Sequence, residues 1–410
     1  MSADGFSIAL LVVESVTRCG GAAADPSGRP QFAPWDVPRP LTGAPACSER
    51  SRIKRTADPM TILMEEIAEQ PPALSNLRKY YASPGAIPYQ ALRKLATHWP
   101  PTVVFTGMGS SLFAAYPAQA YLTGLGIRAV LWETAELLHH HLKFLGHDTL
   151  LVVVSQSGET VEVVRLLERL PEKVSVLAVT NVEVSRLAHR ARLLLPMMAG
   201  RQTMVSTKTY TCAVAALLYL AAAIARKPQG PITEAVRRAA EAQERILDRH
   251  EDLIPPMVEF FNAPPYVALM SRGPDLASAH QGALMLKEVA RLSAEAISAA
   301  QFRHGPIEII DPGHRYVIFA RQGAPRSRTG KLLTKLADDI RVHGGRVLLL
   351  TDLPFRDTPN VRLLKVEPIR LGLGTLVDSL YIQLLAHDLA LRAGLEPGKF
   401  RIATEVTHEE

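Results

Sequence analysis

The sequence predicts an α/β protein made of two tandem doubly wound parallel-sheet domains. Apolar, β-branched runs of strand length recur along the chain and alternate with helical patterns. These runs are mostly continuous rather than alternating, which is typical of parallel strands that helices cover on both faces. The same succession of strand, loop and helix occurs twice, so we expect the two halves of the chain to share one plan.

Three predicted strands of the first half have counterparts in the second half. The pairs are residues 103–106 with 266–270, 151–154 with 316–319, and 174–179 with 346–350. The helical patterns between the strands cover residues 112–125, 161–169, 277–292 and 330–343. Because the pairs occur in the same order, the duplication predicts two doubly wound sheets with binding loops at the carboxyl ends of their strands.

The expected domain organisation follows from these patterns. Residues 1–59 contain many prolines and no sustained periodicity, so we expect a disordered extension there. Organised sequence starts at Met60, which keeps translation from Met60 open as an alternative. The expected parts are an opening helix with a first sheet domain at 60–228, a linker helix at 229–254, a second sheet domain at 255–395 and a tail at 396–410.

Composition and charge narrow the class of protein. Of 410 residues, 47% are hydrophobic and 21% are charged, as in a soluble globular protein. The net charge of +6 comes from scattered basic residues, and with 6% aromatic residues no nucleic-acid partner is expected. A basic surface suits phosphorylated metabolites instead.

The cysteines and the apolar runs bear on location. The three cysteines, Cys19, Cys47 and Cys212, are odd in number and lack the spacing of a metal site. This argues against a disulfide framework and for a reducing compartment, and we expect a cytoplasmic protein. The apolar run at 212–225 comes closest to the length of a membrane helix, but Lys208 and Arg226 bound it, and it predicts a buried core helix. No membrane partner is expected.

The loop that ends the run LVVVSQSGET, residues 151–160, favours an anion site. An apolar strand ends there in hydroxyls and a glycine, and a helical pattern begins at Val161. The first-turn N–H groups of a helix are unpaired and its dipole is positive at that end. Ser155, Ser157 and Thr160 add hydroxyl donors, and the absence of Lys and Arg suits a phosphate monoester. The alternative is an ordinary strand-to-helix turn with a capping serine.

A second glycine- and serine-containing turn, at residues 107–111, follows the first predicted strand. It resembles the start of a dinucleotide-binding fingerprint, but Leu112 and Phe113 stand where the last glycine is required. We therefore expect neither a dinucleotide nor another cofactor. The turn is expected to close one side of the pocket whose other side is the loop 155–160.

Two carboxylates in an apolar helical pattern are candidates for acid–base chemistry. Glu288 and Glu295 are seven residues apart, so they share one helix face if the helix persists. A carboxyl group in apolar surroundings holds its proton more tightly, which suits a general base that works near neutral pH. The alternative is a solvated helix face.

The histidines offer one catalytic candidate and one metal candidate. His304 precedes Gly305 and Pro306, a rigid turn that gives the imidazole a fixed direction, although a lone histidine is more often structural. The three histidines at 139–141 occupy adjacent helical positions, which point in different directions, so no metal site is expected.

Together these motifs resemble the sugar isomerase (SIS) domain proteins. The resemblance is carried by SQSGET at 155–160, GMGSS at 107–111, the segment 206–208, and LKE, AEA and HGP between 286 and 306. It extends from about residue 60 to the C-terminus. It is strongest to the isomerase half of glucosamine-6-phosphate synthase and to the SIS-type glucosamine-6-phosphate deaminases. It implies two tandem SIS domains of the flavodoxin-like type.

The resemblance also implies a role for each matched position. Glu288 would be the base that moves a proton between C1 and C2, and His304 would assist ring opening from the neighbouring subunit of a homodimer. The sugar phosphate would be held by Ser111, Ser155, Gln156, Ser157 and Thr160. Further substrate-binding positions would be Gly109, Ser110, Ser206, Thr207, Lys287, Ala403 and Thr404, the last two in a tail that closes the active site.

Two departures from the family pattern bear on the reaction. The synthase carries an N-terminal glutaminase domain, for which residues 1–59 are too short, so no ammonia from glutamine is expected within this chain. The synthase and many deaminases have a lysine just before the Val-Thr of the tail, where Thr404 and Glu405 stand here, and Met285 replaces a lysine near the LKE segment. A Schiff base between the protein and the open sugar is therefore not expected.

The sequence and the resemblance together predict an isomerase or deaminase that acts on glucosamine 6-phosphate or fructose 6-phosphate. The proton transfer needs no metal, because a carbonyl or iminium serves as the electron sink and helix termini neutralise the phosphate. One alternative is a fructosamine-6-phosphate deglycase with the same base and phosphate loop. Another is a catalytically silent sugar-phosphate sensor, which would need neither Glu288 nor His304.

Overall fold

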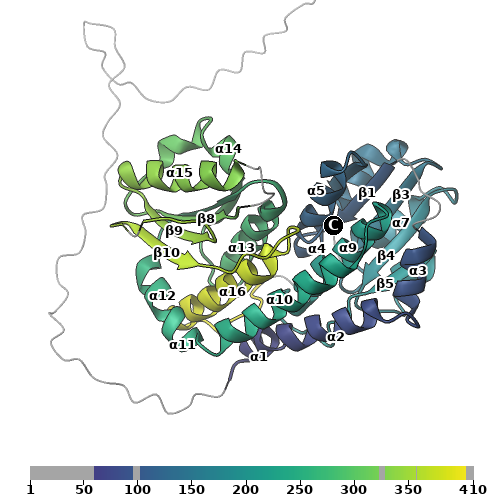
Figure 1. The fold of residues 1–410 in the computed structure, drawn as a ribbon, viewed down its shortest axis with the longest axis horizontal. Helices are drawn as coiled ribbons and strands as arrows, with labels where there is room; N and C mark the ends of the chain where they lie inside the picture. The colour runs from purple at the N-terminus through teal and green to yellow at the C-terminus, as the bar shows by residue number, and fades with distance from the viewer. Residues whose placement is uncertain (1–59, 96–101, 323–327, 357, 403–410) are drawn as a thin grey trace, which may run out of the picture. The chain divides into compact units, whose positions relative to one another are not determined.

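Two five-stranded parallel sheets form the framework of the structure (Figure 1). The computed structural model describes residues 60–95, 102–322, 328–356 and 358–402, all of which fall in one compact unit. The first sheet consists of β1 (Thr102–Gly107), β2 (Arg128–Glu133), β3 (Thr149–Val154), β4 (Ser175–Thr180) and β5 (Leu193–Pro196). The second sheet consists of β6 (Val267–Ser271), β7 (Ala294–Ser298), β8 (Arg315–Ala320), β9 (Arg346–Thr351) and β10 (Val361–Lys365).

The two sheets have the same strand order. It is β2-β1-β3-β4-β5 in the first sheet and, from the opposite edge, β7-β6-β8-β9-β10 in the second. The three strand pairs matched in the sequence therefore hold equivalent places: β1 with β6, β3 with β8, and β4 with β9. The predicted fold class, two doubly wound parallel sheets, is confirmed.

Helices connect the strands in both halves. Those of the first half are α1 (Ile62–Ala68), α2 (Gln70–Ala82), α3 (Ile87–Leu95), α4 (Ser110–Phe113), α5 (Tyr116–Gly124), α6 (Thr134–Glu136), the short η1 (Leu137–His141) and η2 (Leu142–Phe144), α7 (Val161–Arg169), α8 (Arg186–Arg190) and α9 (Lys208–Ile224). Those that follow are α10 (Gly230–Leu247), α11 (His250–Leu253), α12 (Pro255–Phe261), η3 (Gly273–Asp275), α13 (Leu276–Glu288), α14 (Ala299–Phe302), η4 (Pro306–Ile309), α15 (Thr329–Val342) and α16 (Gly374–Arg392).

Alternate residues of the central strands point into different cores. In the first sheet Phe105 belongs to the largest core, whereas Val104 packs in a smaller one with α7 and α8. In the second sheet Leu269 joins the same largest core, whereas Met270 packs in a third core with α15. One face of each sheet thus contributes to a core that both halves share. Burial on both faces explains why these strands are continuous apolar runs.

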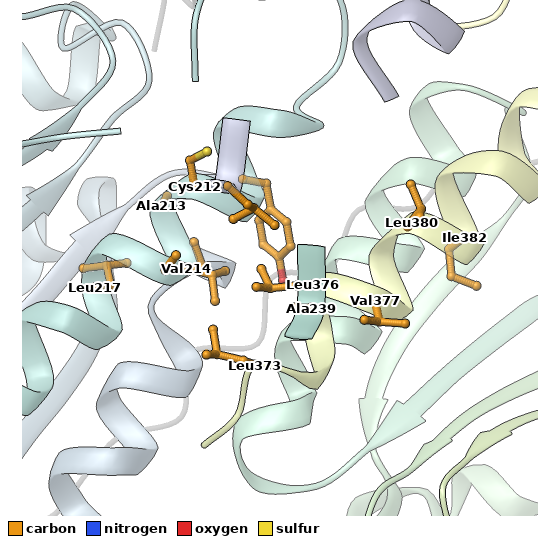
Figure 2. Close-up of a cluster of buried hydrophobic side chains, with 14 of the residues drawn as sticks. Cys212, Ala213, Val214, Leu217, Ala239, Leu373, Leu376, Val377, Leu380 and Ile382 are labelled. Carbon is orange, nitrogen blue, oxygen red and sulfur yellow. The ribbon is translucent and has the colours of Figure 1, made fainter. Parts of the chain in front are cut away.

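Two long helices, α9 and α16, lie in this shared core. Each follows the last strand of its half, and nearly every residue of each is buried. Figure 2 shows Cys212 and Leu217 of α9 in one apolar cluster with Leu376 and Leu380 of α16. The core helix predicted at 212–225 is confirmed as part of α9. Within the described residues, none of the helices combines the length and the apolar character required to cross a bilayer.

The helix predicted at 112–125 is interrupted in the structure. The short helix α4 ends at Phe113, and α5 begins at Tyr116 with Pro117 in its first turn. Proline is well suited to a helix start because its missing N–H group has no intrahelical partner there. The break separates the serines of the 107–111 turn from the longer helix.

The helix predicted at 277–292 ends at Glu288. The N–H group of Leu292 bonds to the Leu286 carbonyl, and Arg291 adopts a left-handed φ of 53°. Glu295 lies on the strand β7 and accepts a hydrogen bond of 2.6 Å from the Tyr266 hydroxyl. The prediction that Glu288 and Glu295 share one helix face is therefore wrong.

A buried ion pair closes the carboxyl edge of the second sheet. The Arg321 guanidinium, directly after β8, contacts the Asp378 carboxylate of α16, and both side chains are at most 3% exposed. Arg321 also donates to the Glu367 carbonyl at 2.6 Å, and the Ser278 hydroxyl donates to Asp378 at 2.9 Å. A buried pair needs such additional hydrogen bonds to offset the cost of removing its charges from water.

Replacing one member of this pair is expected to destabilise the fold. The D378N substitution leaves the Arg321 guanidinium buried without its counter-charge, so the free energy of unfolding should fall by about 3–5 kcal/mol in urea denaturation. The exposed pair of Lys399 and Glu396 gives a matched control, and E396Q should cost less than about 1 kcal/mol. Equal losses in the two variants would contradict a special role for the buried pair.

Candidate functional site

The loop after β3 is held in shape by its own hydroxyl groups. The Ser155 hydroxyl accepts from the Gly158 N–H at 3.0 Å and pairs with the Thr160 hydroxyl at 3.1 Å. The Ser157 hydroxyl accepts from the Glu159 N–H at 3.1 Å. Thr160 is the N-cap of α7, and its hydroxyl does not cap the helix. The first turn of α7 therefore keeps N–H groups without an intrahelical partner, as an anion site requires.

The same loop is fastened to its neighbours. The Gln156 carbonyl accepts from the Asn181 N–H at 3.1 Å, and the Gly158 carbonyl accepts from the Leu187 N–H at 3.3 Å. Gly158 has a φ of 68°, and a side chain there would collide with Ser185. Only glycine fits this position, so the loop is preorganised and its backbone has little freedom to adjust.

The turn after β1 lies at the same edge of the sheet. Because β1 pairs in parallel with β3, residues 107–111 and 155–160 leave the sheet side by side. A Cβ atom on Gly107 would lie 2.9 Å from the Val154 carbonyl oxygen, so the two chain segments approach closely. Gly109 has a φ of 49°, and Ser110 and Ser111 form the first turn of α4, half-buried. The structure thus brings the two predicted loops together.

Helix α13 of the second half packs against this turn. Leu284 lies beside Gly109, where a Cβ atom would be 3.8 Å from its side chain. Leu284 and Glu288 are four residues apart on one face of α13, so Glu288 extends from the face that meets α4. Gln281, one turn further back, donates to the Ser206 carbonyl of the first half at 3.1 Å.

Burial perturbs the acidity of the Glu288 carboxyl group. Glu288 is the last residue of α13 and half-buried. Burial raises the pKa of Glu288 to about 7, although the adjacent Lys287 ammonium acts in the opposite direction. Lys287 itself is exposed. A carboxyl group with this pKa exists in both protonation states near neutral pH.

The segment before α9 contributes structure more than free donors. Thr207 is buried, and its hydroxyl contacts the Gln202 side-chain oxygen at 3.3 Å. The Ser206 hydroxyl pairs with Thr209 at 2.9 Å. Lys208 is buried and forms an ion pair with Glu69. The predicted positions Ser206 and Thr207 thus already have protein partners.

His304 lies apart from this group. It is exposed in the turn between α14 and η4, and its N–H group donates to the Gln301 carbonyl at 2.9 Å. In the described part of the chain, no hydrogen bond joins His304 to Glu288. Ala403 and Thr404 lie outside the described residues.

Sequence reasoning missed two residues of α13 that meet the first half. One is Gln281, which is fully buried and whose Oε1 atom has no hydrogen-bond partner among the described residues. The other is His280, which stacks on Phe113 and Tyr116. The spacing of seven from Glu288 could have identified Gln281, but His280 becomes informative only when its partners from the first half are known.

The three consecutive histidines have a structural environment. They end η1, and the His141 ring stacks on Trp132 with centroids 4.7 Å apart. Across residues 60–95, 102–322, 328–356 and 358–402, no group of three or more His, Cys, Asp or Glu side chains could hold a metal ion. Cys212 is a buried free thiol whose pKa burial raises to about 12.

The raised pKa of Glu288 predicts a pH-dependent part of the stability. The pKa rises from its ordinary value of 4.5 to about 7 on folding because burial disfavours the carboxylate. The folded protein binds this proton more tightly than the unfolded chain, so the protonated carboxyl group adds to the free energy of unfolding. This stabilisation is complete below pH 4.5 and is lost as the pH rises through about 7. Wild type should therefore lose stability relative to E288Q across this window in chemical denaturation.

A matched control separates Glu288 from other carboxyl groups. E295Q removes a carboxylate from the edge strand and should keep the wild-type pH dependence. Burial and the neighbouring Asp378 also raise the pKa of Asp275 to about 7, but Asp275 is present in all three proteins and cancels in the comparison. Parallel stability curves for wild type and E288Q would contradict the raised pKa.

Comparison with known proteins identifies the fold. The SIS domain family matches residues 98–223. The glutamine–fructose-6-phosphate aminotransferase [isomerizing] of Brucella abortus is 28% identical over 320 residues, which is 75% of this chain and 52% of the relative. The chain thus spans about half the length of the curated relatives it matches.

Two solved structures show the same architecture over most of the chain. One is the C-terminal domain of glucosamine-fructose-6-phosphate aminotransferase from Francisella tularensis, with a TM-score of 0.73 at 22% identity, covering 82% of this chain and 98% of that one. The other is the glucosamine-6-phosphate deaminase of Thermotoga maritima, with a TM-score of 0.66 at 20% identity, covering 85% and 99%. Residues 98–223, which carry the first sheet, match the SIS domain family, and the second sheet has the same strand order.

Proposed function

We propose that this protein binds a sugar 6-phosphate and transfers a proton between C1 and C2 of the open sugar. The observation that carries the proposal is the position of Glu288. This carboxyl group, with its pKa raised to about 7, extends from the face of α13 that packs against the turn beside the phosphate loop. The names of the relatives support the substrate class, since they act on fructose 6-phosphate or glucosamine 6-phosphate.

The phosphate is assigned to the first half of the chain. The N–H groups at the start of α7 and the hydroxyls of Ser157, Thr160 and Ser111 would hold its oxygens. The Ser155 hydroxyl already bonds within the loop, so its main contribution is to keep the loop in shape. Gln156 is half-buried, and its backbone carbonyl is engaged. Its side-chain amide has no hydrogen-bond partner among the described residues and would meet a sugar hydroxyl.

The chemical step is assigned to Glu288. In the open aldose its carboxylate removes the C2 proton, and the electron pair moves to the C1 carbonyl oxygen. The protonated carboxyl group, which can exchange its proton with solvent, then delivers a proton to C1. With an amine at C2, an amine proton passes to the C1 oxygen and the product is a C2 imine, which water hydrolyses to fructose 6-phosphate and ammonia. This is the deaminase reaction.

Ring opening is assigned to His304 of a second subunit. Within one chain His304 is exposed and has no hydrogen bond to Glu288, so a second copy would have to bring an imidazole to the site. We therefore propose a homodimer in which each subunit completes the site of the other.

A second candidate is the release of an amine from a fructosamine 6-phosphate. Met285 is buried in the core at a position where the resemblance expects a lysine, and Thr404 stands in the tail where a second lysine is expected. Without these amines Glu288 can still move a proton from C1 to C2 of the fructosamine, which gives a C1 imine that water hydrolyses to an aldose 6-phosphate and the free amine. The phosphate loop would serve both substrates equally.

Turnover assays distinguish these functions. Purified protein is incubated with glucosamine 6-phosphate, and in parallel with a panel of fructosamine 6-phosphates, while ammonia or the free amine and the sugar phosphate are quantified. We expect turnover of at least one of these substrates. Tight binding of these sugar phosphates without any turnover would contradict an enzymatic function and favour the alternative of a catalytically silent sugar-phosphate sensor.

The E288Q substitution tests the assignment of the base. Loss of a general base should lower the rate of C1/C2 proton exchange with deuterated solvent by about 10²–10⁴-fold while sugar-phosphate binding persists. The wild-type rate should rise with pH, be half-maximal near pH 7 and level off at higher pH, because only the carboxylate form acts as the base. The control E295Q should exchange at the wild-type rate. Full activity of E288Q would refute the choice of base.

A mixing experiment tests the shared site. The variants E288Q and H304A should each be inactive, but a dimer with one chain of each contains one site with both Glu288 and His304. Unfolding and refolding the two variants together should therefore recover about a quarter of wild-type activity, as expected for random pairing. The double variant, with E288Q and H304A in the same chain, should show no activity after the same unfolding and refolding. No recovery in the mixture would show that His304 acts within its own subunit.

A further inference from the structure

His280 joins the two halves next to the proposed site. Its ring, on α13, stacks on two rings of the first half, with centroids 5.0 Å from Phe113 and 5.2 Å from Tyr116. The interplanar angles are 27° and 20°, so both contacts are stacked. The His280 Nε2 atom is also 3.4 Å from the Tyr116 hydroxyl. The imidazole thus has aromatic contacts and a polar contact in one position.

These contacts bear directly on Glu288 through the geometry of the helix. His280, Leu284 and Glu288 follow one another at intervals of four residues, so they share one face of α13. The first stacks on the rings around α4 and α5, the second lies beside Gly109, and the third is the proposed base. A rotation or shift of α13 relative to α4 would therefore move Glu288 relative to the phosphate turn.

The chemistry of an imidazole suits this place. Burial lowers the pKa of His280, and the Lys287 ammonium acts in the same direction, so the neutral ring is favoured. A neutral ring can stack on two aromatic side chains without leaving a charge between them. The titratable or charged groups facing it are Tyr116, from α5, and Lys287, from its own helix.

We propose that His280 is a positioning residue that fixes the base Glu288 relative to the sugar-phosphate site across the two halves of the chain. This inference rests on the proposed function for its catalytic consequence, but the contact between the halves is independent of that function. Displacements of about 1 Å can cost an enzyme about a hundredfold in rate, so a small loss of order at this contact has a measurable effect.

The kinetic experiment compares H280A with H280F. H280A removes the ring and should lower kcat for proton exchange by about tenfold or more, because the base is then misplaced. KM for the sugar phosphate should change by less than about threefold, because the proposed phosphate loop is untouched. H280F restores the stacking and should recover kcat to within about threefold of wild type. The control H343A truncates an exposed histidine at the end of α15 and should leave both constants unchanged. Unchanged kcat in H280A, or no recovery in H280F, would overturn the proposal.

A distance measurement tests the contact without any turnover. Spin labels are attached to cysteines that replace two exposed residues, Thr123 of α5 and Ser293 after α13. The full-length chain is used, with Cys19 and Cys47 changed to serine so that they are not labelled. Cys212 is buried and should not be labelled. Pulsed electron paramagnetic resonance should give a narrow distribution of distances between the two labels in wild type and H280F. In H280A the distribution should be broader or shifted.

The two experiments separate the two proposals. If wild type shows no proton exchange, the proposed function fails, and the distance distributions alone decide the contact. A distribution in H280A equal to that of wild type would overturn the positioning role. If H280A does not fold, H280N replaces it, since it also removes the ring while keeping a polar side chain, and it should give the same broadening.

Discussion

The packing of α13 against the turn after β1 is the contact on which the proposed site depends. The proposed phosphate loop, residues 155–160, belongs to the first half of the chain, whereas Glu288 belongs to the second. Neither half contains both groups, so their distance is set by tertiary packing rather than by local sequence. The shared core around α9 and α16 holds the sheets, and the hydrogen bond from Gln281 to Ser206 joins α13 to the first half. A rigid framework of this kind is what places a base accurately.

The two sheets have the same strand order, but the residues at their carboxyl edges differ in chemistry. Ser155 follows β3 directly, and Arg321 follows the equivalent strand β8. At the first edge, hydroxyls and the start of α7 remain suited to an external anion. At the second edge, the Arg321 guanidinium is neutralised from within by Asp378. The second edge is therefore closed by its own charges, which fits a role in holding α16 rather than in binding phosphate.

The sequence was sufficient for the strands at the centre of each sheet and for the strand-to-helix loop at residues 155–160. Strands such as β3 are buried on both faces, so their apolar runs are continuous and easily recognised. The edge strands β2 and β7 were missed because they are partly exposed, and their mixed composition gives no such run. The extent of α13 was overestimated because the apolar pattern continues past Glu288, while the left-handed turn at Arg291 that redirects the chain has no signature in the sequence. His280 was missed for a related reason, since its significance lies entirely in the rings it meets.

The position of Glu288 at the end of α13 strengthens the case for a base. Burial already raises the pKa of this carboxyl group, because a charge loses its hydration there. The C-terminus of a helix carries the negative end of the helix dipole, which further disfavours a carboxylate. Lys287 opposes both effects, but it is exposed, and water screens its charge. A carboxylate in such unfavourable electrostatic surroundings readily accepts a proton from a sugar carbon. Had the helix continued to Glu295, the dipole would end elsewhere and only burial would oppose the charge on Glu288.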